Sequence, residues 1–296
     1  MKRVTAPALS AMKERGERIS MLTCYDATFA RLVDQAGIDA VLVGDSLGMV
    51  VQGHESTLPV TVDDIVYHCR AVSRALKRAH LVADMPFMSY QASAEDALRN
   101  AGRMLAEAGA QSVKLEGGAE IAPTVRRLVH AGIPVMGHIG LTPQSVHALG
   151  GFTVQGRDEE SARRLMADAL ALQEAGAFSV VLEAVPRALA TAITARLQIP
   201  SIGIGAGEGC DGQVLVLYDA LGLNAEFHPR FVKRYLEGHA LVTEALARYS
   251  HEVKSGEFPA REHAFESQRS APALRLVSPA GESDEAEGSS LYAAPV

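Results

Sequence analysis

The chain has 296 residues, of which 48% are hydrophobic and 5% aromatic, and it has no tryptophan, a composition typical of globular proteins. Its net charge of −7, without a dense run of lysine and arginine, argues against a nucleic-acid partner. No apolar run approaches the roughly 20 residues that a membrane helix needs. The length suits one large α/β domain of roughly 250 residues with extensions, or two smaller domains.

The N-terminal segment does not read as a signal peptide, because charged residues from Lys13 to Arg18 interrupt it before any sufficient apolar core. We expect a surface helix there and a cytoplasmic protein. The three cysteines, Cys24, Cys69 and Cys210, are far apart and form no zinc-like cluster. They are therefore predicted to be free thiols in a reducing compartment.

Short apolar runs alternate with helical patterns along most of the chain. Strands are predicted at Ile19–Cys24, Ala40–Val43, Leu81–Ala83, Val113–Leu115, Ile133–Met136, Val180–Leu182, Ser201–Ile204 and Val214–Leu217. Helices are predicted at Asp26–Gln35, Val62–Lys77, Ile121–His130, Glu159–Glu174 and Arg187–Arg196, with another after Ser93 and C-terminal helices up to about Lys254.

Four of the predicted helices end in the same way, with an alanine followed by a glycine that suits a left-handed stop: Gly37, Gly109, Gly132 and Gly176. Strands and helices that alternate through about eight rounds predict a (β/α)8 TIM barrel. A doubly wound sheet is the alternative, but no GxGxxG motif follows the first strand.

The barrel with its N-terminal helix is predicted to form one catalytic domain over residues 1–266. From about Gln268 serine, alanine, proline, glutamate and glycine dominate and the periodicity is lost. We therefore expect residues 267–296 to form a flexible tail without a catalytic part.

Five successive apolar runs are each followed by an ionisable side chain: Asp45, Asp84, Glu116, His138 and Glu183. In a barrel, the carboxyl ends of the strands converge on one rim. Any one of these residues could be only a helix cap or a solvated loop residue. Their joint occurrence is the stronger signal, and it predicts one active site.

The connection that begins at Gly44 is longer than a usual βα loop, and long loops in compact domains are usually functional. It ends at Thr61, with Asp63 and Asp64 behind it, which predicts a capped helix start.

Buried carboxylates repel one another unless a cation offsets their charge. Oxygen ligands without thiolates favour a hard cation, Mg2+ first. We predict Asp45 and Asp84 as direct ligands. Glu116 is either a third ligand or acts through water.

Lys114 lies two residues before Glu116 on a strand, so both side chains face the same side. Lys114 could pair with Glu116, hold an anionic substrate or form a Schiff base. His138 could be a hydrogen-bonded rim residue or a substrate contact. Glu183 stands in an apolar frame that suits a general base, although it could instead cap the next helix.

Several longer motifs resemble the ketopantoate hydroxymethyltransferase family, and together they span roughly Ile19 to Phe265. They are Val43–Thr61, Ala83–Phe87, Val113–Gly118, Gly137–Gln144, Gly150–Phe152, Val154–Arg157, Ile202–Gly207 and Asp211–Gln213.

This resemblance implies a barrel related to phosphoenolpyruvate-utilising lyases and an assembly of ten copies in two stacked pentamers. It implies that Asp45 and Asp84 hold Mg2+ with Glu116 in the coordination sphere, and that Glu183 accepts a proton. The implied contacts with the keto acid are Asp45, Ser46, Asp84 and Lys114.

The reaction that the resemblance implies belongs to pantothenate biosynthesis. A hydroxymethyl group passes from 5,10-methylenetetrahydrofolate to 3-methyl-2-oxobutanoate, giving 2-dehydropantoate and tetrahydrofolate. The enolate would be stabilised on Mg2+ with help from Lys114 and His138.

Three alternatives stay open from the sequence. A lyase or mutase of the isocitrate lyase type would share the barrel and Mg2+, but no Lys-Lys-Cys-Gly-His-like segment is present. An aldolase could use Lys114 as a Schiff-base amine. A non-catalytic barrel that binds keto acids is the third.

Overall fold

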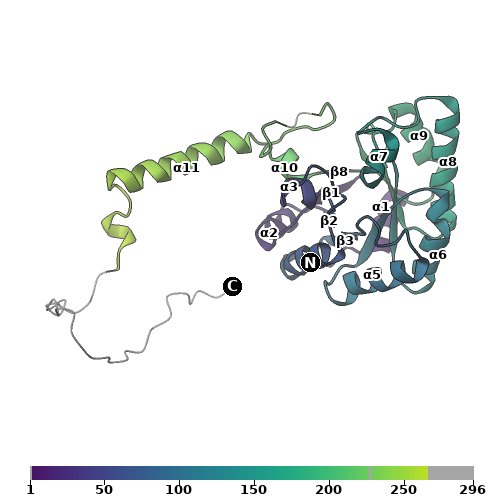
Figure 1. Ribbon diagram of the computed structural model, residues 1–296, viewed down its shortest axis with the longest axis horizontal. Coiled ribbons are helices and arrows are strands. Elements are labelled where there is room, and N and C mark those ends of the chain that lie inside the picture. Colours follow the sequence, from purple (N-terminus) through teal and green to yellow (C-terminus); the bar gives the residue numbers. More distant parts are fainter. Residues whose placement is uncertain (1, 227–228, 266–296) are drawn as a thin grey trace. The chain divides into compact units, whose positions relative to one another are not determined.

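The computed structural model describes residues 2–226 and 229–265. Within them, eight parallel strands follow one another in sequence order and close into a barrel (Figure 1). The strands are β1 (Ile19–Thr23), β2 (Ala40–Val43), β3 (His80–Asp84), β4 (Ser112–Glu116), β5 (Val135–Gly140), β6 (Ser179–Glu183), β7 (Ser201–Ile204) and β8 (Gly212–Leu215). The prediction of a (β/α)8 TIM barrel is confirmed.

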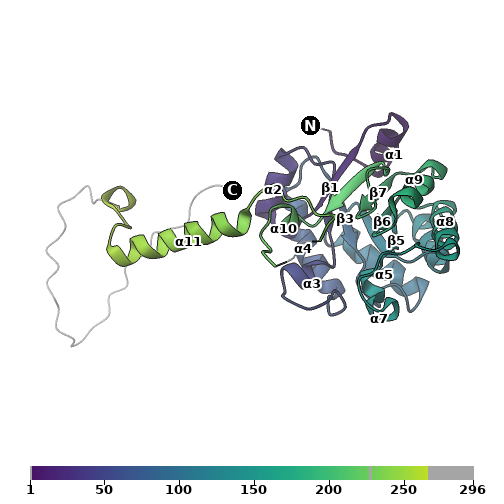
Figure 2. The ribbon, with the colours of Figure 1, turned by 90° about the horizontal axis from the view of Figure 1, so that it is seen from above.

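Helices surround the strands, as the view from above shows (Figure 2). The longer ones in the barrel are α1 (Ala6–Glu14), α2 (Ala27–Gln35), α4 (Val62–Ala75), α5 (Ala94–Ala106), α6 (Ala122–His130), α8 (Glu159–Glu174) and α9 (Arg187–Arg196). Short helical turns are α3 (Leu47–Val50), η1 (Ala119–Ile121), η2 (Pro143–Ser145), α7 (Val146–Leu149) and α10 (Leu217–Ala220). The chain continues into α11 (Gly238–Ser255) and η3 (Arg261–His263).

Local signals in the sequence account for where the helices begin and end. Gly176 ends α8 with φ +97°, and a Cβ there would lie 2.9 Å from the Val129 side chain, so both the turn and the space require glycine. Thr61 begins α4 with a capping box, in which its hydroxyl accepts from the Asp64 amide and the Asp64 carboxylate accepts from the Thr61 amide. The predicted cap at Thr61 is confirmed.

The apolar residues form two cores on the two sides of the strands. The larger core lies between the outward-facing strand residues and the helices, and the smaller fills the barrel interior. Val4 and Leu9 belong to the smaller core, so the N-terminal segment and α1 pack against the inward-facing residues of β1. The predicted N-terminal helix therefore contributes the buried Leu9 side chain to this core, and the segment before it contributes Val4.

Four strands, β3 to β6, reach further toward their carboxyl ends than the apolar pattern predicted, whereas β1 and β8 end one and two residues earlier than predicted. Asp84, Glu116 and Glu183 are the last residues of their strands, and β5 extends through His138 to Gly140. The prediction of β5 at Ile133–Met136 was about two residues early at its start. Backbone pairing continues past the apolar runs, as Glu116 pairs with His138 and Gly140 pairs with Glu183.

The end of the barrel departs from regular alternation. The described residues 205–211, between β7 and β8, form no helix, and β8 starts at Gly212, two residues before its predicted start. A Cβ on Gly212 would lie 2.5 Å from the carbonyl oxygen of Ile19, so glycine permits this close pairing of β8 with β1.

The described chain divides into two compact units, one up to Leu241 and one that begins at Val242. All eight strands lie in the first unit. A single domain that ends at residue 266 stays a prediction, and residues 267–296, the predicted tail, lie outside the described part. Cys24, Cys69 and Cys210 are free and buried. None of the described helices combines the length and apolarity that a bilayer crossing requires.

Candidate active site

A cluster of charged side chains fills the carboxyl-terminal mouth of the barrel. Strand periodicity turns five charged side chains toward the barrel axis. Asp84, His138 and Glu183 each lie two residues beyond a residue of the inner core, and Lys114 and Glu116 alternate with Val113 and Leu115, which belong to the outer core. Register brings neighbours together, with Asp84 opposite Lys114 and Glu116 opposite His138. The structure thus brings these residues together at one end of the barrel, as the sequence predicted.

Lys114 lies at the centre of the cluster and is 4% exposed. Its Nζ lies 2.7 Å from Asp84 Oδ1 and 4.0 Å from Glu116 Oε1. Burial disfavours the ammonium, but the carboxylates of Asp84, Glu116 and Asp45 outweigh it and raise the pKa of Lys114. A lysine held in the protonated state is a poor nucleophile, so this geometry does not favour a Schiff base.

His138 bridges two carboxylates. Its Nδ1 lies 3.4 Å from Glu116 Oε1, and its Nε2 lies 3.2 Å from Glu183 Oε2. Burial and the Lys114 charge disfavour the imidazolium, but the two carboxylates outweigh them and raise the pKa of His138 to about 9. The ring therefore lies beside the Glu183 carboxylate, whose side chain is 18% exposed, at the edge of the buried cluster.

Asp45 follows β2 directly and completes a set of three buried carboxylates. Its backbone amide donates to Asp84 Oδ2 over 3.2 Å. Burial, reinforced by repulsion from Asp84 and Glu116, raises the pKa of Asp45 well above its ordinary value. Burial also raises the pKa of Asp84, although Lys114 opposes it. The two aspartates thus place their carboxyl oxygens together on one side of the site, where a nearby cation would favour their charged forms.

The third carboxylate, Glu116, differs from the two aspartates. Burial raises its pKa, but His138 and Lys114 overcome this, and the net shift of the Glu116 pKa is downward. Its Oε1 faces His138, and its Oε2 accepts from the backbone amide of Gln144 over 3.0 Å. Both oxygens of Glu116 therefore already have protein partners.

The donor set suits a small divalent cation. Its ligands are oxygens, and the negative charge of its three buried carboxylates exceeds the positive charge of the one lysine and one histidine beside them. Within residues 2–226 and 229–265, no three or more His, Cys, Asp or Glu side chains are grouped as ligands of one ion. The fit to Mg2+ rests instead on the oxygens of Asp45 and Asp84, since this ion usually takes one or two carboxylates and completes its sphere with water and substrate.

Gln144, in η2, is a site residue to which the sequence analysis assigned no role. Its Nε2 donates to Asp45 Oδ2 and to the carbonyl of Met85, each over 2.9 Å. Its Oε1 accepts from the hydroxyl of Tyr90 over 2.8 Å. Because the Met85 carbonyl can only accept, the amide orientation is fixed, and one oxygen of Asp45 is held by a donor.

Ser46 lies at the start of α3 and is partly buried. Its Oγ lies 2.9 Å from the hydroxyl of Tyr25, which is almost fully buried. No hydrogen bond from the Ser46 side chain to the charged cluster is present among the described residues. Ser46 thus adjoins the cluster through its neighbour Asp45, and its predicted substrate contact stays a prediction.

Comparison with protein families gives a match over almost the whole described chain. The family model described as ketopantoate hydroxymethyltransferase matches residues 3–261. The 3-methyl-2-oxobutanoate hydroxymethyltransferase of Pelobacter propionicus is 59% identical over 264 residues, covering 89% of this chain and 98% of that protein. The enzyme of the same name from Geobacter sulfurreducens is 58% identical over 257 residues, covering 87% and 96%.

Solved structures share the fold at low identity. A phosphonopyruvate hydrolase in complex with oxalate and Mg2+ superposes with a TM-score of 0.58 at 13% identity, covering 89% of this chain and 93% of that one. A 2,3-dimethylmalate lyase, described as a member of the PEP mutase/isocitrate lyase superfamily, gives a TM-score of 0.57 at 18% identity, covering 88% of each chain. The extent of the family match and the identity to its members show that this chain belongs to the ketopantoate hydroxymethyltransferase family.

Proposed function

We propose that the charged cluster at the barrel mouth is the site at which this family's reaction, hydroxymethyl transfer to 3-methyl-2-oxobutanoate, takes place. The observation that carries the proposal is the excess of three buried carboxylates, Asp45, Asp84 and Glu116, over the two buried cationic groups, Lys114 and His138. Such an excess is costly unless a further cation joins it. Removal of the C3 proton from a small α-keto acid requires such a cation, which stabilises the enolate, and a nearby base.

Asp45 and Asp84 are the proposed direct ligands of Mg2+. Glu116 acts through water, because His138 and the Gln144 amide occupy its oxygens. Bound there, the cation would polarise the keto group of the substrate and make the neighbouring C3–H more acidic.

The protein's own groups supply the rest of the proposed chemistry. Lys114 presents a buried positive charge to the substrate carboxylate, and Ser46 offers a hydroxyl beside it. Glu183 accepts the C3 proton, and the His138 ring holds its carboxylate in place. His138 also adds positive charge next to the oxygen on which negative charge develops.

The proposed donor of the one-carbon unit is 5,10-methylenetetrahydrofolate. Its methylene carbon bonds to C3 of the substrate, water supplies the hydroxyl oxygen, and the donor leaves as tetrahydrofolate. The product is 2-dehydropantoate, and the place of the reaction is pantothenate biosynthesis. We further propose, from membership of the family, that ten copies assemble.

Replacing Glu183 by glutamine tests the assignment of the base. The amide keeps an oxygen that can accept from His138 but cannot take a proton, so exchange of the substrate C3 proton with D2O should fall about 100-fold or more. The exchange is followed by proton NMR with Mg2+ present and without the folate donor. Binding of Mn2+ to the variant should stay within about twofold of the unchanged protein.

Glu208→Gln is the matched control, because Glu208 is an exposed glutamate that pairs with Arg187. It should leave exchange unchanged. Loss of both exchange and Mn2+ binding in Glu183→Gln would show that Glu183 supports the site as a whole, and its assignment as the base would then be wrong.

A further inference from the structure

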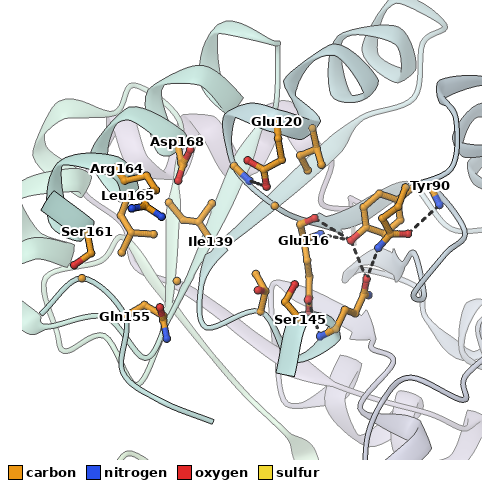
Figure 3. A pocket seen from close by; sticks show the side chains of 18 of the residues that line it. Tyr90, Glu116, Glu120, Ile139, Ser145, Gln155, Ser161, Arg164, Leu165 and Asp168 are labelled. Carbon is orange, nitrogen blue, oxygen red and sulfur yellow. Dashed lines mark hydrogen bonds between the residues drawn. The ribbon is translucent and has the colours of Figure 1, made fainter. Parts of the chain in front are cut away.

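A cavity of about 330 Å3 lies next to the charged cluster, between the carboxyl ends of β4 and β5 and helix α8 (Figure 3). This volume falls within the range of small-molecule sites, roughly 300–1,000 Å3. Glu116 and Gln144 line the cavity and also belong to the cluster, so the two spaces share a wall. The keto-acid chemistry proposed above uses none of the groups at the far end of this cavity.

We propose that this cavity binds the 2-amino-4-oxopyrimidine ring of the tetrahydropterin one-carbon donor. The inference rests on the proposed function, because it takes the donor from there. It adds the place at which the donor is recognised and the residue, Asp168, that recognises it.

Two carboxylates line the cavity, Asp168 from α8 and Glu120 from η1 (Figure 3). Asp168 Oδ1 accepts from the Ala119 amide over 2.9 Å, and Glu120 Oε1 accepts from the Gly118 amide over 2.8 Å. The second oxygen of each carboxylate has no hydrogen bond among the described residues. Each carboxylate is thus fixed by one oxygen and has the other available for a ligand.

The backbone is shaped to bring Asp168 to this position. A Cβ on Gly118 would lie 2.3 Å from Asp168 Oδ1, so only glycine lets the carboxylate approach the amide. Asp168 comes from the middle of α8 and is half-buried, and burial together with the nearby Glu120 raises the pKa of its carboxyl. An acidic group placed this way favours a ligand that brings N–H donors.

The donor's ring has the matching chemistry. Its ring N–H and its 2-amino group are adjacent donors on one edge, as in a guanidinium. One of them can donate to the free Oδ2 of Asp168, and the other to the second lone pair of Oδ1, which also accepts from the Ala119 amide. Phe87, which is 41% exposed, and Ile139 supply apolar surface for the ring faces. The ring's reactive end can then point along the shared wall toward the cluster.

Isothermal titration with 5-formyltetrahydrofolate, a stable donor analogue, tests this assignment on protein loaded with Mg2+ and 3-methyl-2-oxobutanoate. Asp168→Asn keeps an oxygen for the Ala119 amide but places an amide group where the free carboxylate oxygen was. Its dissociation constant should rise about 10-fold or more, because a charge-assisted pair is lost. Glu159→Gln, on an exposed glutamate of the same helix, should leave the constant unchanged.

Unchanged affinity in Asp168→Asn, or no binding of the analogue to the unchanged protein, would overturn the assignment. The thermal midpoint of the variant is compared with that of the unchanged protein, and Glu120→Gln carries the test if Asp168→Asn unfolds early. Exchange of the substrate C3 proton is measured separately on the unchanged protein without folate. Failure of that exchange would contradict the proposed function, whereas the titration judges the cavity alone.

Discussion

Gln144 joins parts of the active site that are far apart in sequence. Its side chain reaches Asp45, 99 residues away, and its backbone amide reaches Glu116. The Tyr90 hydroxyl bonds its Oε1, accepts from the Glu116 amide and is itself buried. In the proposed metal site, this contact would set which oxygen of Asp45 faces the ion.

Gln144→Met should therefore weaken metal binding while keeping the side-chain volume similar. We expect the Mn2+ dissociation constant of the substrate-free protein to rise about 10- to 100-fold, as for other groups that orient metal ligands. Electron paramagnetic resonance of free Mn2+ measures it directly.

Gln155→Met is the control for this change, because the Gln155 side chain bonds only to Thr153 among the described residues. It should leave Mn2+ affinity unchanged. Equal affinity in Gln144→Met and the unchanged protein would mean that Asp45 needs no such support.

The sequence predicted the charged residues of the site much better than their supporting residues. Asp84, Glu116 and Glu183 could be found because each interrupts an apolar strand at its carboxyl end, where a barrel gathers its chemistry. Gln144 and Asp168 could not, because their roles depend on a turn and a helix face that pack against distant segments. Gln144 interrupts no apolar run. Asp168 does interrupt the apolar stretch 165–172, but it does so inside a predicted helix, where a lone polar residue is expected on the exposed face.

Among the elements, those with strong local signals were predicted and those shaped by tertiary contacts were not. Glycine stops and caps fixed most helix ends, as at Gly176 and Thr61. The strand ends were misjudged because backbone pairing continues into polar residues, as from Glu116 to His138. The turn α3 also went unpredicted, and it lies within the long connection that begins at Gly44.

The capping box at Thr61 closes that connection and starts α4. Thr61→Ala removes the hydroxyl that accepts from the Asp64 amide and should lower the free energy of unfolding by about 1 kcal/mol. Urea unfolding measures the change. Thr124→Ala, within α6, removes a hydroxyl that makes no hydrogen bond among the described residues, so it should not destabilise the protein.

If Thr61→Ala unfolds at the same urea concentration as the unchanged protein, the connection itself, rather than its cap, holds the start of α4.

For the barrel as a whole, the amino-terminal end of the strands is stabilising while the carboxyl-terminal end carries the chemistry. His80 lies at the amino-terminal end, 1% exposed, with Nε2 2.9 Å from Ser112 Oγ and its ring against Phe178. Burial lowers the pKa of His80 to about 4, well below its ordinary value. The folded barrel therefore holds this histidine neutral.

Stability should consequently fall as the pH falls from about 6.5 to about 4. In that window the unfolded chain binds a proton at His80 and the folded chain does not, which favours unfolding by up to about 3 kcal/mol at the lower end. Above pH 6.5 both states are neutral, so no contribution remains.

His80→Gln removes the titrating group and should flatten part of this dependence. The test compares urea midpoints of both proteins from pH 7.5 to 4.5, so that the titration of Asp45 and Asp84 cancels in the difference. Parallel curves would contradict the assignment of the acid sensitivity to His80.

The central claim is that this chain transfers a hydroxymethyl group with a cation held by Asp45 and Asp84. Proton NMR of 3-methyl-2-oxobutanoate with the protein, methylenetetrahydrofolate and Mg2+, beside a matched sample in EDTA, tests it most directly. We expect 2-dehydropantoate in the first sample alone. Product in EDTA would contradict the metal site and point to Lys114 as a Schiff-base amine, and no product in either sample would contradict the reaction itself.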